Sequence, residues 1–311
     1  DNWAWKGKAA FTAEYGDWEY YAQAAANFNQ DGAKDLNKVE KTSRQLRKHG
    51  EKRLLQMALN YQESHNQNLR GKSIVGDANW LMFDYNRGYA TDHCTSGIMD
   101  LMRLPKFAYY FYQSQRPAHE KSKKYDSGPM LFAATYWQEN SKPKVRVFSN
   151  CDTVIAYLNG KEISRQKPDQ DKFSDNINHP PFTFDFGKFT PGTISFKGLI
   201  KGKKVAEHSV STPGKAMSLK IFVDQSGKKL KADNNDFVFV YAAVVDAKGS
   251  IVPEASNQLN FTLQGGSIVG PSSIKAEAGI NGVLVRANAK TVNITVESKG
   301  LKKAQFKLKT K

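Results

Sequence analysis

The spacing of apolar residues changes once along this chain, near residue 116, and that change constrains the fold more than any other feature. From Pro129 onward, apolar and polar residues alternate with period two, and turn residues interrupt the pattern. Alternation of this kind is typical of strands with one buried face, and repeated short strands indicate a β-sandwich. Before residue 116, strand-like and helix-like segments follow each other. We therefore predict a mixed α/β portion followed by all-β domains.

The all-β part divides at Pro213-Gly214 into two predicted immunoglobulin-like sandwiches, residues 127–212 and 215–311. Asn159-Gly160, between two apolar runs, predicts a tight type I′ hairpin. The strands expected in the first sandwich are residues 145–148, 153–158, 182–186 and 194–196. Those expected in the second are residues 219–223, 237–245, 261–263, 282–287 and 292–296.

Residues 1–118 are predicted to contain alternating strands and helices. A helix is expected over residues 43–61 from apolar side chains at helical spacing, which are Leu54, Met57, Ala58 and Tyr61. A short buried strand follows at residues 73–76. A second helical stretch is expected over residues 98–115, divided at Pro105 because proline is strongly disfavoured inside a helix.

Two apolar runs in this portion end abruptly in residues that can take part in catalysis or bind a substrate. One ends in Glu14-Tyr15-Gly16, and the other, some sixty residues later, leads into Trp80 and Asp84. Functional side chains in a (β/α)8 barrel lie at the C-terminal ends of its strands. A barrel of this kind closes only with eight strands, and the sequence indicates two. We therefore expect the chain to be the C-terminal portion of a larger enzyme.

The composition and the distribution of charge limit the classes of molecule that the protein is expected to bind. A net charge of +16 would suit nucleic acid, but the basic residues are scattered and no nucleic-acid motif accompanies them, so we predict no nucleic-acid partner. A sulfated or otherwise anionic polysaccharide would be attracted to the same surface. No apolar run approaches the roughly 20 residues that span a bilayer, and we predict no membrane partner. Cys94 and Cys151 are interpreted as small buried apolar residues, and the dispersed carboxylates indicate no metal or other cofactor.

These motifs, in this order, resemble glycoside hydrolase family 2, which includes β-galactosidases, β-glucuronidases and β-mannosidases. Glu14-Tyr15-Gly16 is similar to the nucleophile motif of that family, and residues 80–85 to the strand whose tryptophan forms the floor of the sugar pocket. Residues 97–110 resemble the helix that closes the barrel. Residues 149–161 and 244–253 resemble the sandwiches that follow it in the β-galactosidase branch. The resemblance implies the C-terminal part of a TIM barrel followed by two immunoglobulin-like sandwiches.

The resemblance also implies a retaining mechanism, in which two carboxyl groups about 5 to 5.5 Å apart act as nucleophile and as acid and then base. Glu14 would be the nucleophile, and Tyr15 would orient it or contact the substrate. The other reading of Glu14 is a carboxylate paired with a nearby Lys or Arg. The acid/base glutamate of the family belongs to an Asn-Glu pair that this chain lacks. We therefore expect the chain to be inactive alone and to need the N-terminal remainder of the same enzyme.

Substrate contacts are expected from the segment that follows the second strand. Trp80 would stack on a sugar ring or pack in the core, and Asp84, Asn86 and His93 would bind hydroxyl groups or cap turns. Residues 92–97 lack the lysine that grips a uronic acid in the β-glucuronidases of the family.

The leading hypothesis for the substrate is a terminal β-galactosyl residue of an oligosaccharide, red-algal galactans included. Another exo-glycosidase of the family, such as a β-glucuronidase or β-mannosidase, and a carbohydrate-binding or scaffolding module remain the alternatives. We expect a periplasmic or secreted bacterial protein.

Overall fold

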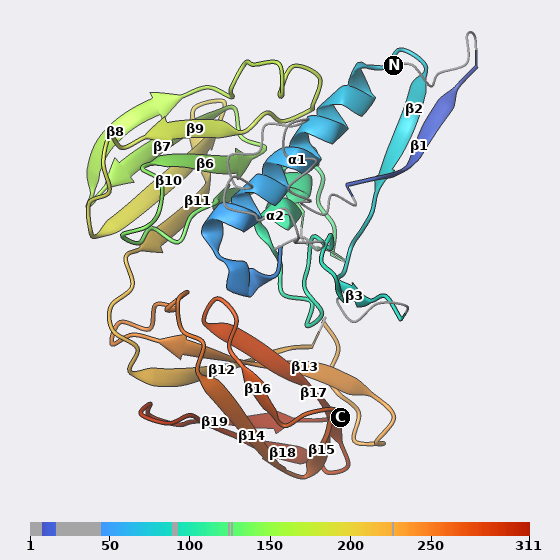
Figure 1. Ribbon diagram of the computed structural model, residues 1–311, viewed down its shortest axis with the longest axis vertical. Coiled ribbons are helices and arrows are strands. Elements are labelled where there is room, and N and C mark those ends of the chain that lie inside the picture. The colour runs from blue at the N-terminus through green and yellow to red at the C-terminus, as the bar shows by residue number, and fades with distance from the viewer. Residues whose placement is uncertain (1–7, 17–44, 89–92, 124, 126, 226) are drawn as a thin grey trace, which may run out of the picture. The chain divides into compact units, whose positions relative to one another are not determined.

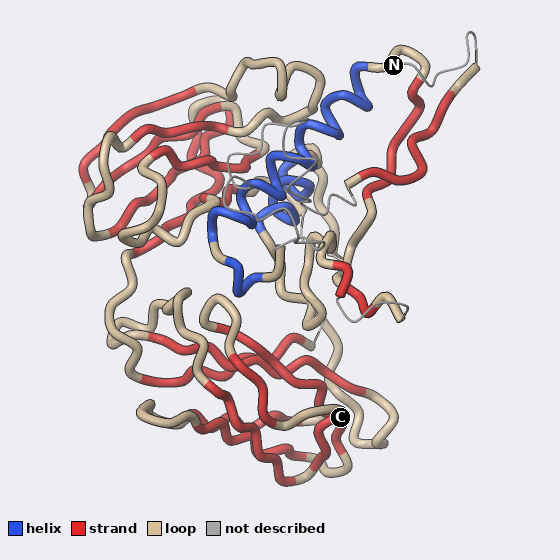
Figure 2. The backbone as a smooth tube through the Cα atoms, viewed as in Figure 1, coloured by secondary structure: helices blue, strands red, loops and turns tan. Residues whose placement is uncertain are grey.

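The structure is a computed structural model that describes residues 8–16, 45–88, 93–123, 125, 127–225 and 227–311. Contacts divide the chain into two compact units, Asp1–Thr212 and Pro213–Lys311. The first contains helices and strands, and the described part of the second contains strands joined by loops (Figures 1 and 2). The two units are described separately.

The first unit begins with two parallel strands, β1 (Ala10–Tyr15) and β2 (Ile74–Asn79), which lie side by side in Figure 1. Helix α1 (Glu51–Arg70) lies between them in the sequence. Parallel neighbours need a long crossover of this kind, because a tight hairpin joins only antiparallel strands. A parallel pair with a helical crossover is the repeating element of a (β/α)8 barrel. The closed barrel itself remains a prediction.

Helix α1 begins and ends later than the sequence analysis predicted. Gly50 has a φ of 86°, a left-handed conformation that favours glycine, and it separates a 3-10 turn at Arg47–His49 from α1. The predicted start at residue 43 lies outside the described residues. At the other end the helix continues to Arg70, because buried polar residues such as Gln62 and Asn66 extend its packed face. Polar side chains on a buried face do not contribute to an apolar pattern.

The second helix was predicted correctly only in its later part. Helix α2 (Phe107–Ser114) begins just after Pro105. Residues 98–105 are not helical, because the backbone N–H groups of Ile98 and Met99 donate to the carbonyl oxygens of Leu81 and Met82, each at 3.0 Å. This segment therefore acts as a strand-like partner for the chain that leaves β2.

The remainder of the first unit is a two-layer β-sandwich. One sheet has the order β5-β6-β9 and the other β11-β10-β7-β8. Their bounds are β5 Leu131–Ala133, β6 Lys144–Ser149, β7 Thr153–Leu158, β8 Lys161–Gln166, β9 Phe182–Asp185, β10 Thr193–Ile200 and β11 Lys203–Ser211. Alternate residues of both sheets share one core, which includes Val147, Phe184, Ala156 and Phe196. Asn159 and Gly160 both have positive φ, 51° and 83°, as the predicted type I′ turn requires.

The second unit is also a two-layer β-sandwich. Its sheets have the orders β12-β13-β17-β15 and β16-β14-β18-β19. Their bounds are β12 Ser218–Asp224, β13 Phe237–Val245, β14 Gln258–Gln264, β15 Gly266–Val269, β16 Ser273–Lys275, β17 Ile280–Ala287, β18 Thr291–Glu297 and β19 Ala304–Lys309. The core between them includes Val240, Val285, Leu259 and Ile294. Together the two sandwiches give the predominantly β fold that the period-two pattern predicted.

Within the first unit, the helices pack directly against the sandwich. Phe111 of α2 and Met57 of α1 share a buried apolar cluster with Phe148 and Ile177 of the sandwich. The predicted boundary between residues 1–118 and 127–212 therefore falls inside one compact unit, and the division of that unit into two domains remains a prediction. Over the described residues, neither helix combines the length and the apolar character that a membrane crossing requires.

Candidate functional site

The C-terminal ends of β1 and β2 bring Glu14 and Trp80 to the same edge of the parallel pair. Tyr15 pairs with Asn79 in the strand register, and the N–H of Trp80 donates to the carbonyl oxygen of Tyr15 at 2.6 Å. Trp80 is therefore held beside the residue that follows Glu14. Both side chains are exposed, the indole with 38 % of its residue surface accessible. Among the described residues, Glu14 forms no ion pair that would explain its presence at a strand end.

Tyr15 is partly buried whereas Glu14 is exposed, at a point where the register of β1 with β2 is irregular between Thr12 and Tyr15. Its hydroxyl accepts a hydrogen bond from Tyr112 of α2 at 2.9 Å, and its ring packs edge-on against Tyr61 of α1. Burial raises the pKa of the Tyr15 hydroxyl far above its ordinary value. Through these contacts Tyr15 anchors β1 to the helices, and its contact with substrate remains a prediction.

The third position of the Glu14-Tyr15-Gly16 triplet requires glycine. The φ of Gly16 is 91°, and a Cβ at this position would lie 1.9 Å from a ring carbon of Tyr61. Only glycine combines that backbone conformation with so close an approach of the ring. The chain therefore leaves β1 over the face of Tyr61, immediately after the exposed Glu14.

Trp80 is fixed through its backbone while its indole remains accessible. The hydroxyl of Tyr61 lies within hydrogen-bonding reach of the carbonyl oxygens of Trp80, at 2.9 Å, and of Ser96. The Trp80–Leu81 peptide bond is cis. The indole contacts Tyr85 edge to face, with ring centroids 6.3 Å apart. These contacts hold the indole beside the short ladder that follows.

Asn86 and His93 are brought together by that ladder. They are paired across β3 (Tyr85–Asn86) and β4 (His93–Cys94), and both are exposed. The Asn86 side-chain oxygen accepts from the N–H of Gly88 at 3.2 Å, which leaves its amide group directed to other partners. The ladder thus places an exposed amide and an exposed imidazole side by side, next in sequence to Tyr85 and Cys94, and both groups can donate to and accept from hydroxyl groups.

Asp84 does not join this exposed group, contrary to the expectation that it binds substrate. Its side chain is completely buried and forms an ion pair with Lys106, with Oδ1 and Nζ 2.8 Å apart. Oδ1 also accepts from the N–H of Gly97 at 2.9 Å, and Lys106 donates to the carbonyl oxygen of Thr95 at 2.9 Å. Asp84 and Lys106 therefore fix the fold of the segment that carries Trp80, Asn86 and His93.

Burial dominates the electrostatics of this pair. It raises the pKa of Asp84 to about 6, although the charge and hydrogen bond of Lys106 act in the opposite direction. Burial likewise lowers the pKa of Lys106 from its ordinary value. A Cβ at Gly97 would lie 2.2 Å from the backbone nitrogen of Asp84, so only glycine lets the two segments meet here.

A second group of polar side chains, between β2 and α1, was not predicted by the sequence analysis. Asp77 of β2 accepts from His65 Nδ1 at 2.7 Å and from the side-chain amide of Asn68 at 3.0 Å, both from α1. Although burial pushes the pKa of Asp77 upward, these bonds outweigh it and hold that pKa below its ordinary value. His65 and Asn68 both lie beyond residue 61, where the sequence analysis ends the predicted helix. The spacing of His65 and Asn68, one turn apart on a helix, was the available signal.

The structure places an exposed carboxylate and an exposed indole at the end of the parallel strand pair, and an exposed amide and imidazole on the short ladder that follows in the sequence. An accessible indole gives an apolar face to a sugar ring, and the polar groups can satisfy its hydroxyls. Among the described residues, no group of three His, Cys, Asp or Glu side chains gathers as a metal would require.

Known proteins match this chain over both sandwiches and over most of the first unit. Residues 221–307 match the family described as "Glycoside hydrolase family 2 C-terminal domain 5", and residues 140–206 match a domain of unknown function, DUF4982. A β-galactosidase of Thermoanaerobacter pseudethanolicus is 34% identical over 245 residues, which is 73% of this chain and 32% of the relative. The β-galactosidase BoGH2A of Bacteroides ovatus is 30% identical over 204 residues, 63% of this chain and 22% of the relative.

Solved structures of similar fold include a β-glycosidase from Bacteroides vulgatus, with a TM-score of 0.67 and 21% identity, covering 81% of this chain and 33% of that one. A β-glucuronidase from glycoside hydrolase family 2 gives a TM-score of 0.66 at 23% identity, covering 97% of this chain and 31% of that one. At these identities the likeness concerns the fold. The chain spans about a third or less of the length of each of these proteins.

Proposed function

Because the chain belongs to glycoside hydrolase family 2, as the C-terminal portion of such a protein, we propose that it supplies the nucleophile, Glu14, of a retaining exo-glycosidase. The observation that carries this proposal is the position of Glu14. It is an exposed carboxylate at the C-terminal end of a parallel strand, next to an exposed indole that is held in place by backbone contacts. The remainder of the enzyme would provide the other barrel strands and the second carboxyl group.

In the proposed reaction, a Glu14 oxygen attacks the anomeric carbon of a terminal sugar. The bond from that carbon to the leaving oxygen breaks, and the acid supplied by the rest of the enzyme gives the leaving oxygen a proton. Water then attacks the glycosyl ester, the same acid, now a base, takes the proton from water, and the sugar departs with its configuration retained. In this scheme Trp80 supports the sugar ring, and Asn86 and His93 bind its hydroxyl groups.

We propose a β-galactoside as the substrate, and galactan oligosaccharides, those of red algae included, as its source. The similarity to two β-galactosidases supports this choice. A uronic acid would need a nearby cation, and residues 92–97 contain no lysine. Lys106, the lysine nearest to Gly97 in the sequence, is completely buried and paired with Asp84. The carboxylate of a β-glucuronide would therefore find no partner in this segment.

The test is a Glu14→Gln variant in the complete enzyme, assayed on an aryl β-galactoside and on an aryl β-glucuronide. We expect turnover of the galactoside to fall by about a thousand-fold or more, because removal of a nucleophile usually has effects of that order. Glu139→Gln, at an exposed carboxylate of the first sandwich, is the matched control and should retain turnover. Unchanged activity of Glu14→Gln would contradict the assignment. A wild-type preference for the glucuronide would contradict the choice of substrate.

A further inference from the structure

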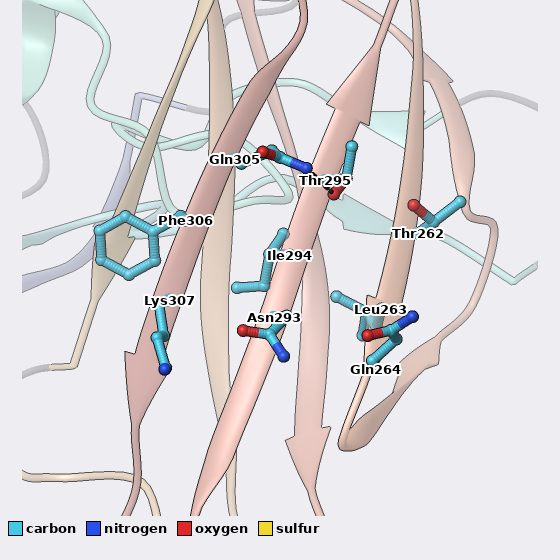
Figure 3. Close-up of a pocket in the computed structure, with 9 residues that line it drawn as sticks. All are labelled: Thr262, Leu263, Gln264, Asn293, Ile294, Thr295, Gln305, Phe306 and Lys307. Atoms are coloured by element: carbon cyan, nitrogen blue, oxygen red, sulfur yellow. Dashed lines mark hydrogen bonds between the residues drawn. The ribbon is translucent and has the colours of Figure 1, made fainter.

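A surface of the second sandwich, far in sequence from Glu14, combines lysines with amide and hydroxyl side chains. In the sheet β16-β14-β18-β19, the strand register aligns Gln264, Asn293 and Lys307 in one row. The row next to it aligns Thr262, Thr295 and Gln305. Figure 3 shows these side chains on one side of the three strands, where with their neighbours they line an open hollow of about 560 Å³.

Strand β19, at the edge of this sheet, carries the positive charge. Lys307 and Lys309 point to the same side, because they are two residues apart in a regular strand, and Lys311 continues this spacing just beyond it. The Cα atoms of successive lysines are therefore spaced at about 6.7 Å along the strand axis. At the other end of the strand, Lys303 forms an ion pair with Glu297 at 3.5 Å, so the unneutralised charge is concentrated toward Lys311.

The loop after β12 brings three more lysines to the same place. The N–H of Lys311 donates to the carbonyl oxygen of Leu230 at 2.8 Å, and this pairing fixes the loop against the end of β19. Lys228, Lys229 and Lys231 then line a hollow of about 500 Å³ together with Lys311. All four are exposed, and within the described part of the chain none forms an ion pair.

Two aspartates of this loop, Asp233 and Asp236, accept hydrogen bonds from backbone N–H groups, and the charge of Lys231 also acts on the carboxylate of Asp233. The carboxylate of Asp233 accepts from the backbone N–H groups of Asn235 and Asp236, at 3.0 and 3.2 Å. The carboxylate of Asp236 accepts from the N–H of Lys231 at 3.3 Å and not from its ammonium group. Like charges gathered in one hollow repel each other, so an anion that binds there would relieve the repulsion.

Protection of the sheet edge accounts for only part of this pattern. Lysines on an edge strand discourage pairing with another chain, and Lys307 and Lys309 suffice for that purpose. Edge protection does not explain why a separate loop places Lys228, Lys229 and Lys231 beside Lys311, at the end of the line of lysines along β19. It also does not explain the rows of amides and hydroxyls beside the lysines.

We propose that this lysine surface, defined by Lys228, Lys229, Lys231, Lys307, Lys309 and Lys311, binds an anionic polysaccharide. The lysines would contact the sulfate or carboxylate groups of a linear chain, and Gln264, Asn293 and Gln305 would hydrogen-bond its hydroxyls. Single-stranded nucleic acid is a poorer fit, because its binding sites add aromatic side chains on which bases stack. Residues 213–311 contain a single arginine, Arg286, and among the described residues that line the hollow beside these rows, Phe306 is the one aromatic side chain. The inference goes beyond the proposed hydrolysis and stands without it.

The test uses the 311-residue chain, with dextran sulfate as the probe and uncharged dextran as the matched ligand. Binding is measured by titration at several salt concentrations. The variant Lys229→Gln/Lys307→Gln/Lys309→Gln should bind dextran sulfate at least ten-fold more weakly. The slope of log K against log salt should also fall by about two to three, because each lysine that contacts an anion releases about one counterion. The control variant Lys142→Gln/Lys161→Gln/Lys188→Gln removes the same charge from exposed lysines of the first sandwich and should bind nearly as the wild type does.

Three outcomes would overturn the proposal. One is an equal loss of binding in the two triple variants, which would make net charge alone responsible. Another is equal binding of dextran and dextran sulfate, or no binding of either polymer. The third is tighter binding of single-stranded poly(dT) than of dextran sulfate with the same dependence on the three lysines. Thermal unfolding of each variant, expected at the wild-type temperature because all six lysines are exposed, verifies that the proteins are folded.

Discussion

At the scale of single residues, the segment after β2 depends on two buried side chains of opposite charge that form an ion pair. Asp84 and Lys106 are both completely buried, and each also bonds to the backbone of the segment, at Gly97 and Thr95. A buried pair of this kind adds little net stability, but removal of one partner leaves an uncompensated charge in the interior. The pair therefore fixes one fold for the residues that display Trp80, Asn86 and His93.

We expect Lys106→Met to lower the free energy of unfolding by about 3 to 5 kcal/mol at pH 7, because methionine fills the space and leaves the Asp84 carboxylate without its cation. The loss should depend on pH. A carboxyl group whose pKa is raised on folding, here from 3.8 to about 6, contributes stability below its unfolded pKa and loses that contribution as pH rises through its folded pKa. Removal of the lysine raises the pKa of Asp84 further, so the variant should approach the wild type near pH 4 and fall away toward pH 7.

Urea denaturation at pH 4.5 and pH 7 measures this difference. The double variant Asp84→Asn/Lys106→Met, which removes both charges, is the control and should recover part of the loss at pH 7. A loss below about 1 kcal/mol at pH 7, or one that is the same at both pH values, would contradict a dominant role for the buried carboxylate.

At the scale of elements, helix α1 links the strand pair to the first sandwich. One part of its surface meets β1 and β2 through Tyr61 and His65. Another meets the sandwich through Gln62, which is fully buried, donates to the carbonyl oxygen of Phe173 at 2.8 Å and accepts from Arg146 at 2.7 Å. This helix therefore contacts both the first sandwich and the strands that carry Glu14 and Trp80, and it fixes the position of one relative to the other.

Gln62→Ala should lower the free energy of unfolding by about 1 to 3 kcal/mol, because it removes a hydrogen-bond partner from the partly buried carbonyl group of Phe173 and from the partly buried guanidinium group of Arg146. The matched control is Gln67→Ala on the same helix, at an exposed position, which should change stability by less than about 0.5 kcal/mol. Chemical denaturation of the two variants measures the difference. Equal effects would show that the contact with the sandwich does not stabilise the helix.

The sequence predicted strands far better than it predicted helix bounds or the inner part of the site. Period-two alternation and the Asn159-Gly160 turn identified both sandwiches, because those signals are local. The C-terminal end of α1 was missed because buried polar residues such as Gln62 and Asn66 interrupt its apolar stripe. The ion pair of Asp84 and Lys106 was missed because a sequence does not show that two charged residues, 22 positions apart, are both buried.

At the scale of the whole molecule, the two compact units differ in how their cores are built. The unit Pro213–Lys311 encloses its own core between its two sheets. In the first unit the sandwich core is supplemented by a second cluster, in which Phe148 and Ile177 pack against α1 and α2. The first sandwich therefore depends on the helices that precede it, and the second unit depends on no other segment for its core.

From this difference we expect residues 213–311, produced alone, to fold and to unfold in one cooperative transition. Residues 129–212 produced alone should be unstable or aggregate, because they would expose Phe148 and Ile177 to water. Circular dichroism with heating and the dispersion of amide resonances distinguish the two results. An unfolded 213–311 fragment, or a 129–212 fragment as stable as the complete first unit, would contradict this division.

The central claim, that Glu14 is the nucleophile of a retaining glycosidase, is tested most directly by trapping the covalent intermediate. The complete enzyme would be inactivated with an aryl 2-deoxy-2-fluoro-β-galactoside, digested, and analysed by mass spectrometry. The account predicts one fluorosugar esterified to the peptide that contains Glu14. A label on another carboxylate of the inactivated enzyme would contradict it.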